Sequence, residues 1–288
     1  MTSLSKSVDY VSDIIQRDIL KQKYAKPIVI GVSGPQGSGK TYLAEHLVSE
    51  IAQKFPDLNC VKFSMDDLYL TNSDQRHLTN EAVKDDNKLL QGRGLPGTHD
   101  IGVGLELFSK LISGEPVAIP IYDKSAFNGE GDRSTSSIPI AKKADLVIFE
   151  GWFNGYIPLD DDLVRIKWLS SLLDPHSCLK IHKLYQIEDI NEKLKNYAVL
   201  WDYFDYFIYI ETDYQNVGKW RLEQEHALIK MTGSGMSDVQ VGQFIERYMP
   251  IYELFYEKLC AEGVCKKKGH NLKLRLSETR DVLESNIF

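Results

Sequence analysis

The chain has 288 residues, of which 43% are apolar and 26% are charged, so it can bury the core of a large α/β domain. Its net charge of −7 lacks the basic field of a general nucleic-acid binder. No segment has the roughly 18 apolar residues of a membrane-spanning helix, and acids interrupt the apolar residues of the N-terminus. We therefore expect no nucleic-acid or membrane partner, and a cytosolic protein with nuclear access left open.

The first hundred residues predict two strands and two helices. Apolar residues near helical spacing predict a helical extension within residues 1–25. Residues 27–33 and 60–64 form apolar, β-branched runs typical of buried strands, and the periodicity of 39–54 between them predicts a helix. Residues 71–100 are polar and rich in turn residues, so no regular element is expected there.

The middle of the chain alternates in the same way. Residues 101–113 have helical periodicity, and 116–123 contain two prolines, which favour an edge or irregular strand. The segment 124–140 is rich in Ser, Gly and Asp and is expected to be a long loop. Residues 144–151 again form a buried strand that ends in Glu-Gly.

The last third of the chain predicts helices at 186–200, 216–231 and 238–262, the last interrupted at a proline. It also predicts strands at 206–211 and 272–277, the second of them the final strand. Strands that alternate with helices favour a mostly parallel sheet with helices on both faces.

No linker divides the chain. We therefore expect a single α/β domain over residues 1–288, with a lid and C-terminal helices over roughly 212–262.

An eight-residue glycine-rich motif follows the first predicted strand and opens a helix. It fits G-x-x-x-x-G-K-[ST] and consists of Gly34, Pro35, Gln36, Gly37, Ser38, Gly39, Lys40 and Thr41. Its glycines allow the backbone to curl so that amide groups and the helix N-terminus hold phosphate oxygens. Lys40 is expected to reach the β- and γ-phosphates of ATP, and the Thr41 hydroxyl to bind Mg²⁺. The motif therefore predicts a P-loop nucleotide-binding fold.

Carboxylates follow two of the predicted strands. Asp66 and Asp67 come directly after the second strand, and Glu150 ends the strand at 144–151. Ligands of parallel α/β sheets bind beyond the carboxyl ends of the strands, where an acid can accept a hydroxyl proton or hold Mg²⁺. The alternatives are a helix N-terminus for the two aspartates and a solvated strand end for Glu150.

Seven further segments add to the motif and together resemble one family. They are FSMDDLYLT at 63–71, RGLPGTHD at 93–100, PIYDKSAFNGEGDR at 120–133, VIFEGWFNGY at 147–156, NEKLKNYAVLWD at 191–202, KWRLEQE at 219–225 and FIERYMPIYELF at 244–255. In this order they resemble the phosphoribulokinase, uridine kinase and pantothenate kinase family, and most closely its D-glycerate 3-kinase branch. That branch includes fungal-type members whose acceptor is unclear.

The resemblance implies an ATP-dependent small-molecule kinase with a sheet of the nucleoside/nucleotide-kinase type and a helical lid. It assigns the general base to Asp66, with Asp67 as the fallback, and places Glu150 near Mg²⁺. Arg221 of the lid helix and Lys40 would stabilise the transferring phosphate. The residues it assigns to a polar, anionic acceptor are Arg93, His99, Asp100, Tyr122 and Arg133, with Asp67 beside them.

Each of these side chains has a structural alternative. Arg93 and Arg133 also suit surface ion pairs, His99 an ordinary loop, Tyr122 the core, and Arg221 a solvated helix face.

The function also has alternatives. A D-glycerate-like hydroxy acid is the leading acceptor, but a nucleoside or pantothenate-like acceptor, ATP binding without turnover and a P-loop hydrolase that uses water stay open.

Overall fold

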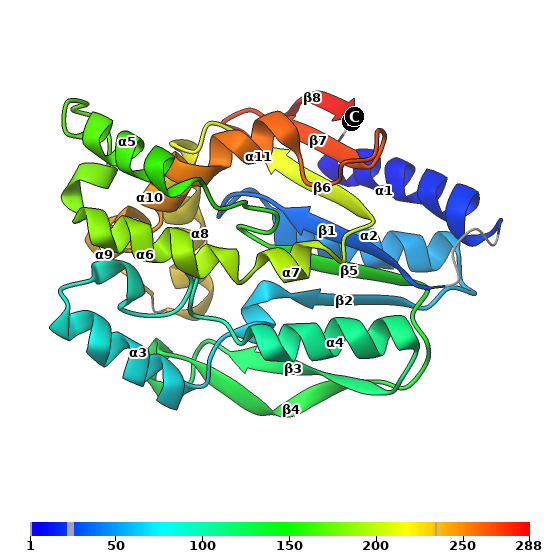
Figure 1. Ribbon diagram of the computed structural model, residues 1–288. Coiled ribbons are helices and arrows are strands. Elements are labelled where there is room, and N and C mark those ends of the chain that lie inside the picture. Colours follow the sequence, from blue (N-terminus) through cyan, green and yellow to red (C-terminus); the bar gives the residue numbers. More distant parts are fainter. Residues whose placement is uncertain (1, 22–25, 234) are drawn as a thin grey trace.

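The computed structural model describes residues 2–21, 26–233 and 235–288 (Figure 1). Part of the expected N-terminal extension, residues 1 and 22–25, lies outside the described residues. The strands are β1 Ile28–Ser33, β2 Cys60–Ser64, β3 Val117–Asp123, β4 Asp132–Ile140, β5 Leu146–Gly151, β6 Tyr206–Glu211, β7 Asn271–Leu276 and β8 Val282–Ile287.

Helical segments connect and cover these strands. The α-helices are α1 Ser3–Ile14, α2 Lys40–Lys54, α3 Asn72–Lys84, α4 Ile101–Ser113, α5 Asp161–Ser171, α6 Leu184–Lys195, α7 Ala198–Trp201, α8 Asn216–Thr232, α9 Asp238–Glu246, α10 Met249–Ile251 and α11 Glu257–Glu262. Short 3₁₀ turns are η2 Met65–Leu68, η3 Lys88–Leu90, η4 Phe127–Gly129 and η5 Leu179–Ile181, and π-helical turns are η1 Ile15–Ile19 and η6 Tyr252–Tyr256. None of the described helices combines the length and the apolar character needed to cross a membrane.

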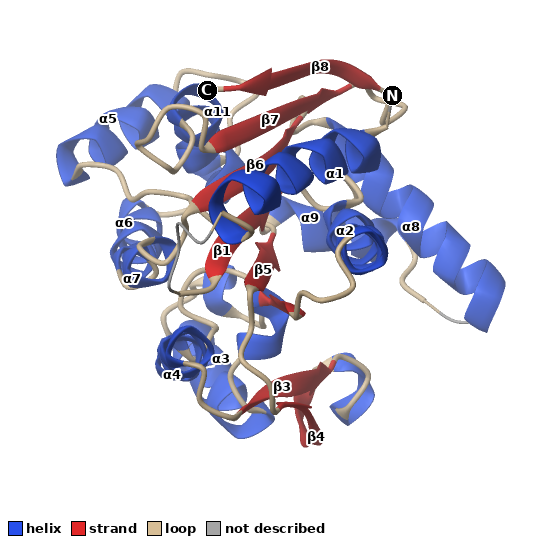
Figure 2. Ribbon diagram, turned by 90° about the vertical axis from the view of Figure 1, so that its right-hand side faces the viewer, coloured by secondary structure: helices blue, strands red, loops and turns tan. Residues whose placement is uncertain are grey.

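Six strands form the main sheet in the order β2-β5-β1-β6-β7-β8, and β3 and β4 form a separate antiparallel ribbon. Strands β2, β5, β1, β6 and β7 are mutually parallel, and only β8 runs antiparallel at the edge. Helices α1 and α2 cover one face, and α4, α6 and α7 lie on the other (Figures 1 and 2). The predicted fold class, a mostly parallel sheet with helices on both faces, is confirmed.

Alternate residues of the central strands face two separate cores. Ile28, Ile30 and Val32 of β1 pack with the apolar faces of α1 and α2, whereas Val29 and Phe149 pack with the core on the α4 side. Every residue of β1 and of β5 is buried. Burial on both faces explains why these strands are continuous apolar runs in the sequence.

The prediction of a long loop at 124–140 is wrong for the second half of this segment, which forms β4. This strand pairs with β3 in an exposed ribbon, with a register shift between Pro120 and Tyr122. All nine of its residues are exposed or half-buried, so the strand needs no buried apolar face, and its run of Ser and Thr shows no hydrophobic alternation. The prediction of an edge or irregular strand at 116–123 is confirmed by β3.

Helices α3 and α5 and strand β8 were not predicted. Within the polar segment 71–100, helix α3 begins after Thr71, whose side chain accepts a hydrogen bond from the Asp74 amide. Its few buried side chains include Asn72, Gln75 and Ala82, so it lacks an apolar stripe. At the C-terminus the predicted strand at 272–277 is confirmed by β7, but it is not the final strand, because β8 follows it.

A substitution of Phe149 tests how much the core on the α4 side contributes to stability. The Phe149 ring is fully buried, and its centroid lies 4.5 Å from that of Phe63 and 5.3 Å from that of Phe108. Phe149→Ala is expected to lower the free energy of unfolding by about 3–5 kcal/mol, measured by urea denaturation, because a cavity replaces the ring. Leu173→Ala, at a side chain that is 91% exposed, is the control and should change stability by no more than about 0.5 kcal/mol. Equal effects of the two substitutions would contradict this account of the core.

Candidate active site

The glycine-rich motif forms a curled turn between β1 and α2. Gly37 has φ 78° and Gly39 has φ 88°, in the left-handed region that glycine adopts readily. A Cβ on Gly37 would lie 2.5 Å from the Trp220 Cβ, so no larger residue fits there. The first turn of α2 has N–H groups without intrahelical acceptors, and its residues Lys40 and Thr41 line a large cavity. The turn therefore has the shape and the donors of a phosphate cradle.

The C-terminal part of the chain fixes this turn from outside. The Gln36 amide donates to the Tyr252 hydroxyl at 3.1 Å, and Arg280 Nε donates to the Gly37 carbonyl at 2.9 Å. The Arg280 guanidinium also lies over the Trp220 ring, 4.9 Å from its centroid. Sequence reasoning missed both supports. Tyr252 lies in the segment at 244–255 but was not singled out, Arg280 lies outside the segments of the resemblance, and both are far from the turn in sequence.

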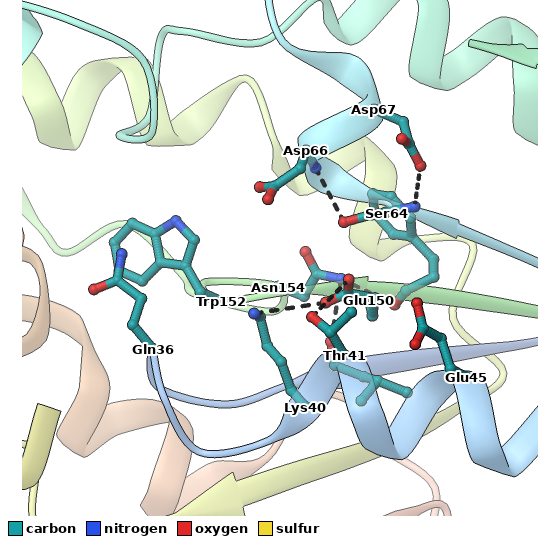
Figure 3. Close-up of polar contacts among 12 residues, drawn as sticks. Gln36, Lys40, Thr41, Glu45, Ser64, Asp66, Asp67, Glu150, Trp152 and Asn154 are labelled. Atoms are coloured by element: carbon teal, nitrogen blue, oxygen red, sulfur yellow. Dashed lines mark hydrogen bonds and ion pairs between the residues drawn. The ribbon is translucent and has the colours of Figure 1, made fainter. Parts of the chain in front are cut away.

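Glu150 lies against the end of the cradle. Thr41 Oγ1 donates to Glu150 Oε1 at 3.2 Å, and Lys40 Nζ lies 3.7 Å from Glu150 Oε2 (Figure 3). The carboxylate is 4% exposed, so the alternative of a solvated strand end does not apply. Asn154 donates to the backbone carbonyls of Val32 and Phe149 and thereby fixes the turn that follows β5.

The polar atoms of this region fit a metal-bound nucleotide. Among the described residues, the buried atoms Gln36 Oε1, Ser38 Oγ and Glu150 Oε2 have no hydrogen-bond partner, although such atoms are normally paired. Thr41 and Glu150 present hydroxyl and carboxylate oxygens, the ligand type that Mg²⁺ prefers. These oxygen atoms therefore suit a Mg²⁺ ion that is bound together with phosphate groups.

The two neighbouring aspartates after β2 point in different directions (Figure 3). Asp67 accepts a hydrogen bond from the Ser64 amide at 2.8 Å, while the Ser64 hydroxyl accepts one from the Asp66 amide at 3.2 Å. This capping box uses the Asp67 carboxylate, so the alternative of a helix N-terminus applies to that residue. Asp66 instead lines the cavity, where its Oδ2 lies 2.5 Å from Lys124 Nζ.

Their surroundings move the pKa values of the two aspartates apart. Burial favours a raised pKa for Asp66, but the charges of Lys124 and Lys40 outweigh burial and lower this pKa to about 2. Burial raises the pKa of Asp67 to about 6, against the hydrogen bond from Ser64 and with the nearby negative charges of Asp66 and Glu150. Asp66 is therefore an anion at neutral pH that faces the cavity.

The cavity has a volume of about 1440 Å³ and joins the cradle to Asp66 and to helices α3, α8 and α9. Seven lysine and arginine side chains and four acidic side chains line it among the described residues, an excess of three positive charges. The chain as a whole has a charge of −7. Positive charge is thus concentrated where the predicted site lies.

Arg93 is the residue of the predicted acceptor set that lines the cavity. Its Nη1 donates to the carbonyls of Gly129, at 2.8 Å, and Glu130, and its guanidinium lies 5.6 Å from the centroid of the Tyr122 ring. These contacts hold the loop after β3 against the site. The Arg93 side chain therefore makes its hydrogen bonds with the protein backbone rather than leaving them for an acceptor.

The other members of that set do not line this cavity: Asp67, His99, Asp100, Tyr122 and Arg133, the last of which lines a second pocket. His99 Nδ1 lies 2.8 Å from the Tyr197 hydroxyl, and burial lowers the pKa of His99 to about 3. Asp100 caps α4 and pairs with Arg133 Nη2 at 3.3 Å, which suits the alternative of an ion pair for that arginine. The motifs placed these residues near the site, but their side chains do not line the cavity.

Arg221 lines the cavity from α8, which extends away from the sheet (Figure 2). Its Nη2 lies 2.7 Å from Glu225 Oε2, and its guanidinium lies 5.4 Å from the centroid of the Phe244 ring on α9. The residue therefore has partners within the helices around it, and it faces the same space as Lys40.

A curled glycine turn at the carboxyl end of a parallel sheet, followed by Lys-Thr, defines a P-loop nucleotide-binding protein. Residues 29–183 match the profile described as Phosphoribulokinase / Uridine kinase family. "Uncharacterized kinase mug58" of Schizosaccharomyces pombe is 36% identical over 290 residues, which cover 97% of this chain and 98% of that protein.

Two relatives carry a more specific name. The chloroplastic D-glycerate 3-kinase of Arabidopsis thaliana is 36% identical over 245 residues, or 82% of this chain and 49% of that protein. The structure of D-glycerate 3-kinase from Cryptococcus neoformans var. grubii has a TM-score of 0.87 and 34% identity, with both chains fully covered. The chain therefore belongs to the phosphoribulokinase/uridine kinase family, and it is an ATP-dependent kinase that transfers phosphate to a hydroxyl group.

The raised pKa of Asp67 predicts a pH effect on stability. An unfolded aspartate releases its proton near pH 4, whereas folded Asp67 keeps it up to about pH 6. Between these values the folded state binds more protons, so rising pH lowers the contribution of Asp67 to the free energy of unfolding. Relative to Asp67→Asn, wild-type stability in urea denaturation should therefore fall between about pH 4 and pH 6. A difference that stays constant or grows over this range would contradict the assignment.

Proposed function

We propose that this kinase phosphorylates the hydroxyl of a short hydroxy acid of the D-glycerate kind, with ATP and Mg²⁺. The observation that carries the proposal is the excess of positive charge around one cavity that contains both the phosphate cradle and Asp66. ATP and a hydroxy acid are both anions, and a cationic cavity in an acidic chain attracts such ligands. The two relatives named D-glycerate 3-kinase supply the particular acid.

The cradle and its neighbours would hold the nucleotide. The amides at the start of α2 and the Lys40 ammonium bind phosphate oxygens, and the Thr41 hydroxyl and the Glu150 carboxylate hold Mg²⁺, directly or through water. The ion supplies charge neutralisation on the phosphates when it is bound. Pairing of Lys40 and Thr41 with Glu150 keeps these side chains at the cradle before ATP arrives.

Asp66 would orient the acceptor hydroxyl and accept its proton, since its carboxylate is ionised and faces the cavity. Lys40 and Arg221 would stabilise the negative charge of the phosphoryl group during its transfer. We propose that α8 and α9 close over the site as a lid, which excludes water and so limits hydrolysis of ATP.

In this proposal residues 1–288 form a single kinase domain, with α1 packed on the sheet as an N-terminal extension. The four cysteines are not joined as disulfides, as in proteins of a reducing compartment, and we propose the cytosol as the site of action.

An acceptor screen tests the function directly. ADP formation is measured with ATP and Mg²⁺ in the presence of D-glycerate, other short hydroxy acids, nucleosides and pantothenate, with Lys40→Ala as the inactive control. We expect acceptor-dependent ADP formation with D-glycerate or a close hydroxy acid. Turnover with only a nucleoside or pantothenate would replace the proposed acceptor, and ADP formation independent of any acceptor would indicate a hydrolase.

Asp66→Asn separates catalysis from nucleotide binding. Turnover should fall by about 10²–10⁴-fold, because the substituted amide cannot accept the hydroxyl proton, whereas the Kd for ATP from calorimetry should change little. The matched control is Asp67→Asn in the same turn, which removes a charge outside the cavity and should keep most of the turnover. Loss of activity in Asp67→Asn with normal activity in Asp66→Asn would assign the base to Asp67 instead.

A further inference from the structure

The ammonium group of Lys124 lies beside the proposed base. Lys124 is the first residue after β3, its side chain is 58% exposed, and it lines the cavity. Its Nζ lies 2.5 Å from Asp66 Oδ2, its one hydrogen-bond acceptor among the described residues. Because an ammonium group has three N–H donors, Lys124 retains donors for a ligand next to Asp66.

The backbone around Lys124 is fixed by the Arg93 side chain and by a local hydrogen bond. Arg93 Nη2 donates to the Lys124 carbonyl at 3.4 Å, and Arg93 Nη1 donates to the Gly129 carbonyl at 2.8 Å. The Asp123 carboxylate accepts a hydrogen bond from the Ser125 amide at 2.9 Å. The position of the Lys124 ammonium therefore follows from a held loop, although the side chain itself is exposed to the cavity.

The neighbouring arginines on the acceptor side already have partners. Arg76 Nε lies 2.7 Å from Glu130 Oε2, and Arg247 donates to the backbone carbonyls of Gln91 and Arg93. Arg93 donates to the loop carbonyls described above. Lys124 is thus the acceptor-side cation that combines direct contact with Asp66, exposure to the cavity and donors left for a ligand.

We propose that Lys124 binds the carboxylate of the acceptor beside Asp66 and thereby selects hydroxy acids over neutral alcohols. This inference rests on the proposed function. A hydroxyl that contacts Asp66 must lie close to Lys124, so an acceptor that satisfies both side chains has its hydroxyl and carboxylate only a few bonds apart. A neutral alcohol of the same size would leave the donors of Lys124 without an anionic partner.

Acceptor binding would also change Asp66. A carboxylate bound to Lys124 shares the ammonium group with Asp66, so Lys124 stabilises the ionised Asp66 carboxylate less. Asp66 then accepts a proton more readily. The titratable groups that surround Asp66 are Lys40, Asp67, Tyr69, His99, Tyr122 and Lys124. Of the two lysines among them, Lys40 belongs to the cradle, which leaves Lys124 to respond to the acceptor.

Lys124→Met tests the inference against two acceptors, D-glycerate and glycerol, which differ by one carboxylate. The KM for D-glycerate, and its Kd measured by calorimetry with a non-hydrolysable ATP analogue, should rise by about 10–100-fold, as expected for loss of a charged hydrogen bond. The preference for D-glycerate over glycerol should fall by a similar factor, and the KM for ATP should stay unchanged. Lys124→Arg should retain much of the preference.

The matched control is Lys110→Met. It removes a lysine whose Nζ also lies 2.5 Å from a carboxylate, that of Glu106 on α4, outside the cavity. This variant should keep wild-type kinetics. The acid limb of the pH profile of kcat should move to higher pH in Lys124→Met, because Asp66 loses a neighbouring cation, and it should not move in Lys110→Met.

The outcomes separate the two proposals. If the wild type phosphorylates D-glycerate and Lys124→Met keeps the wild-type KM and preference, the assignment of Lys124 is wrong while the proposed function stands. If the wild type phosphorylates no short hydroxy acid, both are wrong. Binding of the ATP analogue verifies that the variant is folded, and Lys124→Gln, with the same expected loss, replaces Lys124→Met if that variant does not bind it.

Discussion

Backbone hydrogen bonds between β1, β5 and β2 hold three separate turns of the chain side by side at the carboxyl ends of these strands. Ser33 lies opposite Gly151 in the register of β1 and β5, and Ser64 lies opposite Glu150 in that of β2 and β5. The cradle follows Ser33 and Asp66 follows Ser64, so parallel pairing alone brings amides, lysine and carboxylates together. The contacts of Lys40 and Thr41 with Glu150 depend on this register, as does the distance from the cradle to the proposed base.

Sequence reasoning found the parts of the site that this register determines. The cradle follows the buried apolar strand β1 and Glu150 lies at the end of the buried apolar strand β5, so their position in space could be predicted from pattern and order. The acceptor side could not be predicted in this way, because it consists of loops and an exposed ribbon whose side chains turn according to tertiary contacts. His99, Asp100 and Arg133 lie in the right segments but contact one another or the core, whereas Lys124 stands within the segment quoted at 120–133 and was not singled out.

Charge is distributed unevenly between the surface and the site. An acidic chain with a cationic cavity favours anions in the cavity and disfavours them elsewhere, which suits the binding of ATP and of the small acid proposed as acceptor. The cationic side chains that line the cavity have different partners. Arg93 and Arg247 hold backbone carbonyls and give the site its shape, while Lys40 and Lys124 pair with carboxylates and keep exposed donors.

The hydrogen bond from Arg280 to the Gly37 carbonyl links the C-terminal part of the chain to the phosphate cradle. Arg280 lies in the turn between β7 and β8, at the sheet edge opposite to β2. A ligand that orders the cradle therefore also favours the docked state of this turn, and the docked turn in turn favours the ligand, because linkage between two sites is reciprocal. We therefore expect the turn between β7 and β8 to contribute to the affinity for ATP, so that a truncation after β7 weakens ATP binding without changing a residue of the glycine motif.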